Sequence, residues 1–246
     1  MIEVRQEGGL VHLTIARADK KNALTRQMYA DLANEVDRAA EDDTVHAIVI
    51  TGEGGVFTAG NDLDDFRARA MDLNPKPSAG LAFIERLMVC DTPIIAGVEG
   101  LAIGIGTTML MHCDVVIAGE SALFRTPFVD LGLCPEAAST VMMPLQLGYR
   151  RATDLLIMGE SITGQASLDS GIASQLVPDG AATEEALATG RKLGSKPRDA
   201  LRASKRLLKA PWREQAMAAL EREREAFGKR LQSPECQHAL KRISRR

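Results

Sequence analysis

Hydrophobic and polar residues follow three different patterns near the N-terminus. Residues 2–17 alternate between the two kinds around Gly8 and Gly9, which predicts a β-hairpin because glycine accepts the positive φ of a tight turn. Residues 25–41 carry apolar side chains at helical spacing after a suitable N-cap, Thr25, so they predict a helix. The β-branched run HAIVI at 46–50 stops at a glycine-containing turn, which predicts a buried strand.

Strand-like and helical patterns continue to alternate further along the chain. The runs PIIAGV at 93–98 and DVVIAG at 114–119 are strand-like, with a helical pattern through the 80s before the first and another after Gly104. Strands separated by helices favour parallel crossovers over a sandwich, so we predict an α/β fold. The NPKP segment at 74–77 predicts a surface loop.

The pattern changes past about residue 190. The segments LRASKRLLK and WREQAMAALEREREAF are helical and strongly charged, unlike the apolar strands before them. We therefore divide the chain into an α/β core, residues 1–190, and a helical C-terminal region, residues 191–246.

Composition and charge restrict the class of protein. A chain of 246 residues with 45% hydrophobic and 26% charged residues fits one large globular domain, with or without an appendage. The net charge of −3 gives no general electrostatic reason to bind nucleic acid or an anionic membrane. The apolar stretch 93–119 is interrupted by Glu99, His112 and Asp114, which indicates buried core rather than a membrane span.

The termini and the cysteines predict a cytoplasmic protein. The N-terminus lacks the positive and apolar regions of a signal peptide. The four cysteines show no CxxC spacing, so we expect reduced thiols that pack as small apolar side chains.

Several common catalytic motifs do not fit. Gly104-Ile105-Gly106 lacks the third glycine of a dinucleotide fingerprint, and no glycine run precedes a Walker A lysine. The sequence has neither GxSxG nor HExxH, and its four histidines are scattered singly, so serine hydrolase and zinc sites lack support. We expect His112, in an apolar segment, to be a satisfied core residue.

Two glycine-rich turns, at 54–63 and 99–106, each follow a strand and precede a helix. Glycine lets the backbone turn tightly there and leaves amide N–H groups unpaired at a helix start. Two such turns facing each other would form an oxyanion hole from main-chain N–H groups. The alternative interpretation is that each turn is an ordinary connection between a strand and a helix.

Four motifs occur in a fixed order along the chain. KKNAL at 20–24 and VFTAGNDL at 56–63 precede PIIAGVEGLAIGIGTTMLMHCDVVIAGESALF at 93–124 and PFVDLGLCPE at 127–136. This ordered set resembles the crotonase (enoyl-CoA hydratase/isomerase) superfamily from about residue 2 to 180. The resemblance implies a spiral of ββα units with C-terminal helices that support trimers, often paired into hexamers.

The resemblance also implies an acyl-CoA ligand whose thioester oxygen is held by two backbone amides. Motif by motif, these are the amides of Asn61 and Ile105. The family usually has a glycine where Ile105 stands, but a backbone donor does not depend on its side chain. The implied substrate contacts are Lys21, Ala23, Ala59, Gly60, Asp62, Leu63, Gly104, Phe128 and Leu133. No metal and no separate cofactor are implied, since coenzyme A is part of the substrate.

The acid residues select among the reactions that the resemblance allows. Hydratases of the family use two glutamates, and the corresponding positions here are Thr108 and Phe128, neither of which is a general acid or base at neutral pH. Glu136, after Leu133-Cys134-Pro135, resembles the base of the Δ3,Δ2-enoyl-CoA isomerase branch. One carboxylate suffices for isomerisation, so the sequence predicts a 3-enoyl-CoA isomerase with Glu136 as its acid–base.

Alternatives remain open for these acids and for the function. Pro135 followed by Glu136 also suits the first turn of a helix. There the glutamate would only stabilise the helix, through the interaction of its negative charge with the helix dipole. We expect Asp130 to be a solvated or paired acid, and Asp62, Asp64 and Asp65 to be capping residues. The competing functions are a hydratase with displaced carboxylates, a thioester hydrolase and a catalytically silent acyl-CoA-binding protein.

The basic residues of the tail also have two interpretations. One interpretation is that these residues contact the CoA phosphates. The preferred interpretation is that they form a solvated helix face. The residues concerned are Arg198, Arg202, Lys205, Arg206 and Lys241.

Overall fold

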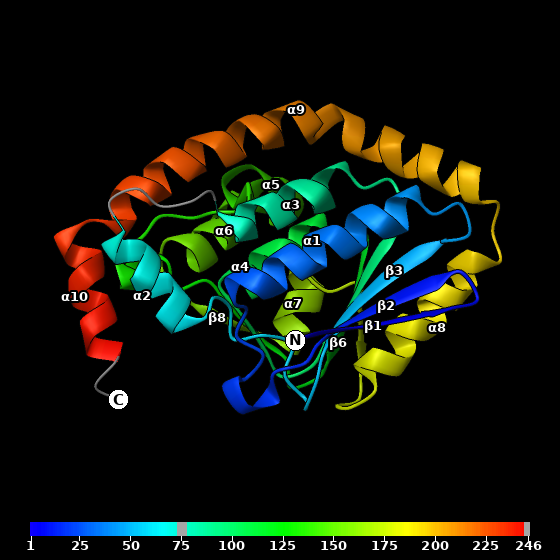
Figure 1. The fold of residues 1–246 in the computed structure, drawn as a ribbon, viewed down its shortest axis with the longest axis horizontal. Coiled ribbons are helices and arrows are strands. Elements are labelled where there is room, and N and C mark those ends of the chain that lie inside the picture. The colour runs from blue at the N-terminus through cyan, green and yellow to red at the C-terminus, as the bar shows by residue number, and fades with distance from the viewer. Residues whose placement is uncertain (73–77, 244–246) are drawn as a thin grey trace.

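The predicted N-terminal hairpin forms one edge of a six-stranded sheet. The computed structural model, shown in Figure 1, describes residues 1–72 and 78–243. The strands of this sheet, in spatial order, are β1 (Ile2–Glu7), β2 (Leu10–Ile15), β3 (Ala47–Gly52), β4 (Ile94–Val98), β6 (Val115–Gly119) and β9 (Gln175–Val177). Among the described strands of this sheet, only the β1–β2 pairing is antiparallel, so the predicted hairpin and the predicted parallel crossovers are both confirmed.

A second sheet of three short strands lies beside the first. Its strands, in spatial order, are β5 (Leu101–Ile103), β7 (Leu123–Arg125) and β8 (Ser161–Thr163). The chain passes from β4 to β5 through Gly100, whose φ is +55° and whose side-chain position is blocked by the Gly55 carbonyl oxygen, 2.5 Å from an added Cβ. One strand in each sheet followed by a helix is the ββα unit that the sequence predicted.

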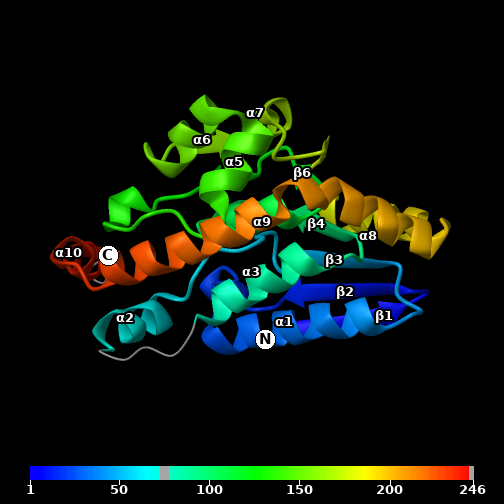
Figure 2. The ribbon, with the colours of Figure 1, turned by 90° about the horizontal axis from the view of Figure 1, so that it is seen from above.

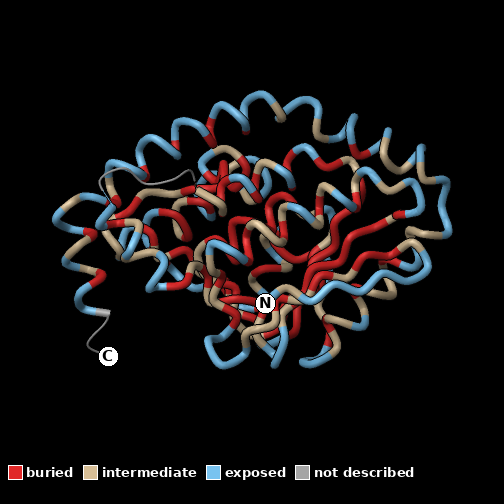
Figure 3. The backbone as a smooth tube through the Cα atoms, viewed as in Figure 1, coloured by how far each residue is buried: buried red, intermediate tan, exposed pale blue. Residues whose placement is uncertain are grey.

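Helices cover both faces of the large sheet. On one face α1 (Arg26–Glu41) and α3 (Ala79–Val89) pack against each other and over the main hydrophobic core. On the other face α8 (Ala182–Gly194) covers a smaller core, and at Gly97 an added Cβ would lie 2.8 Å from the Ala182 carbonyl oxygen. Figures 2 and 3 show these layers and the buried strands between them. Thr25 caps α1 as predicted, since its side chain accepts a hydrogen bond from the Met28 N–H.

The remaining helices surround the two sheets. They are α2 (Leu63–Met71), α4 (Ile105–Thr108), α5 (Ser139–Leu147), α6 (Tyr149–Leu156), α7 (Gly164–Ser170), α9 (Arg198–Leu231) and α10 (Pro234–Ile243). Short 3-10 turns are η1 (Ala18–Lys20), η2 (Met109–His112) and η3 (Val129–Leu131). The predicted surface loop at 74–77 lies outside the described residues.

The long helix α9 arches over the core of its own chain, as Figure 1 shows. Lys205 is only 5% exposed, lies 2.6 Å from the Asp114 carboxylate and donates to the Thr92 carbonyl oxygen. The interpretation of the basic tail residues as a solvated face is therefore wrong for Lys205, because the core supplies its partners. The boundary proposed at residue 190 falls inside α8, and the division into two units stays a prediction.

None of the helices in the described ranges, 1–72 and 78–243, is long and apolar enough to cross a membrane.

The glycine at position 106 is required by close packing rather than by its φ. An added Cβ would lie 2.5 Å from Thr58 Cγ2, so we expect Gly106→Ala to lower the free energy of unfolding by about 1–3 kcal/mol. Gly228→Ala in α9 is the control: no atom lies within 4 Å of the added Cβ, and we expect a gain of about 0.5–1 kcal/mol from helix propensity. Urea unfolding of both variants measures the difference, and equal stability of Gly106→Ala and the wild type would contradict the packing.

Candidate active site

Glu136 is a buried carboxyl group in the irregular segment between η3 and α5. It is 6% exposed, and its Oε1 accepts a hydrogen bond of 3.0 Å from the Thr108 hydroxyl. Burial raises the pKa of Glu136 from 4.5 to about 8. The Thr108 hydrogen bond opposes this rise, the Glu223 carboxylate adds to it, and the Arg69 charge opposes it.

The backbone after Glu136 is not helical. Ala137 and Ala138 have φ angles of +64° and +57°, and α5 begins only at Ser139. The interpretation of Pro135-Glu136 as a helix start is therefore wrong. Two consecutive left-handed residues that are not glycine cost about 1–2 kcal/mol each, so the surrounding structure has to hold this turn in place.

Two buried side chains from other elements hold the turn. His112 in η2 donates from Nε2 to the Ala137 carbonyl oxygen at 2.7 Å. Burial lowers the pKa of His112 to about 4, which keeps the ring neutral and confirms the expectation of a satisfied core histidine. Glu223 in α9 accepts hydrogen bonds from the Ala138 N–H at 2.6 Å and the Thr140 N–H at 2.9 Å.

The two glycine-rich turns lie directly against each other. The Thr58 N–H donates to the Leu101 carbonyl oxygen at 2.9 Å, and the Ile103 N–H donates to the Thr58 carbonyl oxygen at 3.0 Å. Gly60 has a φ of +88°, and an added Cβ would lie 2.6 Å from the Ile103 carbonyl oxygen. The prediction that the two turns face each other is therefore confirmed.

The backbone amides of Asn61 and Ile105 both lie at the meeting point of these turns. Leu24 pairs with Gly60 and Asp62 on either side of Asn61, so the Asn61 N–H points away from that pairing. Ile105 is the first residue of α4, where an N–H has no intrahelical acceptor. Neither amide has an acceptor among the described residues. The Asn61 side chain is held by the Tyr29 hydroxyl, which donates to its Oδ1 at 2.8 Å.

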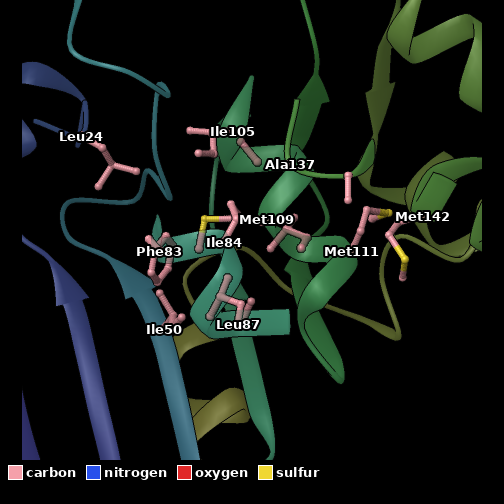
Figure 4. Packing of buried hydrophobic residues seen from close by; sticks show 14 of the residues in the cluster. Leu24, Ile50, Phe83, Ile84, Leu87, Ile105, Met109, Met111, Ala137 and Met142 are labelled. Atoms are coloured by element: carbon pink, nitrogen blue, oxygen red, sulfur yellow. The ribbon is translucent and has the colours of Figure 1, made fainter. Parts of the chain in front are cut away.

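A cavity of about 330 Å³ joins these groups. Its walls include residues of α1, α2, α3 and α9, and the two amide-bearing residues and Glu136 open onto it. The lining residues that matter for the chemistry are Tyr29, Asn61, Arg69, Ile105, Glu136 and Glu223. Figure 4 shows the apolar packing around Ile105, Ala137 and Met109, which are buried in the main hydrophobic core. A carboxyl group with a raised pKa facing backbone donors is suited to proton transfer next to a developing oxyanion.

The predicted CoA-contacting turn lies beside the first amide. The Lys21 carbonyl oxygen accepts from the Ala59 N–H at 2.9 Å, and Ala23 receives a hydrogen bond from Arg17. Buried Asn22 fixes the turn, because its side chain donates to the carbonyl oxygens of Glu53 and Val56, just before and within the first glycine-rich turn. The structure thus places the turn with Lys21 and Ala23 beside the glycine-rich turn with Ala59 and Gly60, which in turn lies against the one with Gly104.

Asp62 also lines the cavity, but its carboxylate is engaged. It accepts from the Asp64 and Asp65 N–H groups at 3.0 Å each and pairs with Arg17 at 2.7 Å, so the capping interpretation is confirmed. Leu63 begins α2 and is 40% exposed.

Phe128 and Leu133 are buried, but neither is a lining residue of the Glu136 cavity in the described structure. Phe128 packs within the main core, and Leu133 borders a depression against α10. Their contact with a substrate stays a prediction. Asp130 forms an ion pair of 2.8 Å with Arg125, so the interpretation of Asp130 as a paired acid is confirmed.

Of the six lining residues named above for the chemistry, three were not predicted from the sequence: Tyr29, Arg69 and Glu223. Tyr29 lies three residues before Leu32 on the apolar face of α1, so helical periodicity could have found it. Glu223 stands in the run EREREA, where nothing distinguishes it from its solvated neighbours. Only the packing of α9 over the core identifies it.

The sequence matches the enoyl-CoA hydratase/isomerase family over residues 5–245. It is 32% identical to enoyl-CoA delta isomerase 2 of Rattus norvegicus over 97% of this chain, which spans only 62% of that relative's length. It is 34% identical to 2,3-dehydroadipyl-CoA hydratase of Escherichia coli, covering 92% of this chain and 88% of that one. The crystal structure of an enoyl-CoA hydratase/isomerase from Pseudoalteromonas atlantica is similar with a TM-score of 0.93 and 37% identity, covering 99% of this chain and 96% of that one.

Two substitutions should shift the pKa of Glu136 in opposite directions. Thr108→Val removes the hydrogen bond that lowers it, so we expect a rise, whereas Glu223→Gln removes a negative charge that raises it, so we expect a fall. Isotope-edited NMR titration of the Glu136 carboxyl group measures both. Glu221→Gln, the same charge change on the exposed side of α9, is the control and should leave the pKa unchanged. Shifts of the same sign in the first two variants would contradict the assigned causes.

Proposed function

The chain belongs to the enoyl-CoA hydratase/isomerase family, and from this we propose that it is an enoyl-CoA isomerase that moves the double bond of a 3-enoyl-CoA to the 2-trans position. One observation carries the proposal: a carboxyl group whose pKa is about 8 faces a cavity that also holds two backbone amides without acceptors in the described chain.

Glu136 is the proposed acid–base. Its carboxylate removes a proton from C2 of the bound thioester, and the electron pair of the broken C–H bond delocalises into the thioester carbonyl to give a dienolate. The protonated Glu136 then returns the same proton to C4, which leaves the double bond between C2 and C3. No other group has to gain or lose a proton. A pKa of about 8 keeps the group effective in both directions.

The amides of Asn61 and Ile105 are the proposed donors to the dienolate oxygen. Backbone donors fixed by the contact of the two glycine turns need no reorganisation when the charge develops, and loss of one such donor costs on the order of 10²–10³ in rate. The contacts of Lys21, Ala23, Ala59, Gly60, Asp62, Leu63 and Gly104 with the CoA portion are part of the same proposal. No separate cofactor is required, since coenzyme A is part of the substrate.

A hydratase is the second candidate, because one of the relatives is named a hydratase. Hydration needs a second acid–base group, and Glu223 is the other buried glutamate that opens onto the cavity. Both of its carboxylate oxygens already accept hydrogen bonds from the Ala138 and Thr140 backbone. This engagement supports the single-base reaction, and it argues equally against a thioester hydrolase that would need a separate base.

Assembly into trimers or hexamers and a cytoplasmic location stay predictions.

Glu136→Gln should abolish most of the conversion of 3-enoyl-CoA to 2-enoyl-CoA, by about 10²–10⁴-fold, because the amide cannot accept the C2 proton. Purified protein is given 3-enoyl-CoA and 2-enoyl-CoA separately, and the products are followed by chromatography. Asp130→Asn, the loss of an exposed paired acid in the same segment, is the control and should retain activity. Undiminished turnover in Glu136→Gln, or product from the 2-enoyl substrate alone, would reject the isomerase, and binding without turnover would indicate the silent alternative.

The pH dependence of the isomerase follows from the raised pKa. Proton removal needs the ionised carboxylate, so kcat/KM should rise about tenfold per pH unit up to a pH of about 8 and level off above it. In Thr108→Val the midpoint should move to higher pH. A rate independent of pH down to mildly acidic conditions would show that Glu136 is already ionised there.

A further inference from the structure

Arg69 is a cation inside the candidate active-site cavity. It lies in the second half of α2, is half-buried, and lines the same cavity as Glu136. Its Nε is shielded from solvent and has no hydrogen-bond partner. Within residues 1–72 and 78–243 its guanidinium group makes no ion pair and no hydrogen bond. A donor that is shielded from water and has no acceptor is costly unless a ligand supplies one, and for Arg69 this donor is the Nε–H.

Comparison with the other arginines shows that Arg69 is unusual. Arg67, Arg198 and Arg202 also have a shielded Nε without a partner. Each of them, however, donates from another guanidinium nitrogen: Arg67 to Asp64 at 3.0 Å, Arg198 to Asp43 at 2.6 Å and Arg202 to Thr92 at 2.9 Å. Arg69 alone among these four lacks such a contact within the described chain.

Most acids around the cavity are already engaged. Asp62 caps α2 and pairs with Arg17, and Asp65 accepts a hydrogen bond of 2.7 Å from the Arg26 N–H. Glu223 accepts hydrogen bonds from the backbone just before and within the first turn of α5. Glu136 is largely uncharged at neutral pH, since its pKa is about 8. Burial lowers the pKa of Arg69, the nearby Arg26 charge lowers it further, and Glu136 opposes this fall.

The rest of the cavity is suited to an apolar chain. Phe66 and Phe227 both line it and pack edge to face, with ring centroids 6.1 Å apart. Leu24, Leu81 and Ile105 add further apolar surface. An acyl chain would therefore meet these apolar side chains and the guanidinium group of Arg69. Arg26 and Arg224 also line the cavity, and Arg224 forms ion pairs with Glu85 and Glu221.

We propose that Arg69 binds a carboxylate at the far end of the acyl chain, so that the preferred substrates are CoA thioesters of dicarboxylic acids. The inference rests on the proposed function in one respect, that this cavity receives the acyl chain. Guanidinium groups match carboxylates with two parallel hydrogen bonds, which a methyl-ended chain cannot form. Asp72, the C-cap residue of α2, also lines the cavity one helical turn beyond Arg69.

Binding of unreactive ligands tests the proposal. Matched pairs of saturated acyl-CoA thioesters with four, six and eight carbons, one member ending in a methyl group and the other in a carboxylate, are titrated calorimetrically. For at least one chain length the wild type should bind the carboxylate-ended member about 10–100-fold more tightly, the value of a charged hydrogen-bonded contact. Arg69→Met should lose this preference and bind the methyl-ended member at least as well as the wild type does.

Controls separate the preference from general damage. Arg67→Met removes a charge from the same helix outside the cavity and should keep the preference, and Arg69→Lys should retain only part of it because lysine lacks the fork. Equal binding of both members by the wild type, or equal weakening of both in Arg69→Met, would overturn the proposal.

The test also distinguishes this proposal from the isomerase. Saturated thioesters bind without any reaction at Glu136, so a carboxylate preference without isomerisation rejects only the proposed reaction. Isomerisation of methyl-ended and carboxylate-ended 3-enoyl substrates with equal kcat/KM, together with equal binding, rejects only the role of Arg69.

Discussion

The contact between the two glycine-rich turns is the constraint on which the candidate site depends. Gly60 lies against the Ile103 carbonyl group and Gly106 lies against Thr58, so a side chain at either position would force the turns apart. The backbone hydrogen bonds of Thr58 with Leu101 and Ile103 fix the register of that contact. Because the amides of Asn61 and Ile105 belong to these same turns, the packing that holds the two sheets together also sets the spacing of the two donors.

Glu136 depends on a second constraint, a backbone turn that the local sequence does not favour. Ala137 and Ala138 both adopt left-handed conformations, which alanine disfavours. His112 binds the carbonyl group on one side of that turn, and Glu223 binds the N–H groups on the other. Glu223 also raises the pKa of Glu136, so one residue of α9 both positions the proposed base and adjusts its proton affinity. The helical C-terminal region therefore contributes to the site as well as covering it.

The cavity combines apolar walls with a few charged groups of different states. Burial raises the pKa of Glu136 to about 8. The carboxyl groups of Asp62 and Glu223 accept hydrogen bonds from backbone N–H groups. The Nε of Arg69 has no acceptor in the described chain. Family membership alone does not distinguish isomerases from hydratases, since relatives of both names match at similar identity. The distinction depends on which carboxylates remain free to exchange protons, and that is a property of their hydrogen bonds.

Local patterns in the sequence determined the hairpin, the helix capped by Thr25, the parallel strands and the two glycine turns, because each depends on residues close together in the chain. The ordered motifs also pointed to the family and to Glu136, Asn61 and Ile105. The sequence could not show that Pro135-Glu136 lies outside a helix, because the left-handed turn after it is imposed by His112 and Glu223, which lie 25 and 85 residues away from their partners. Nor could it distinguish Lys205, Glu223 or Arg69 from other charged helical residues. Their burial and their partners come from the path of α9 and α2 over the core, and only the tertiary structure decides that path.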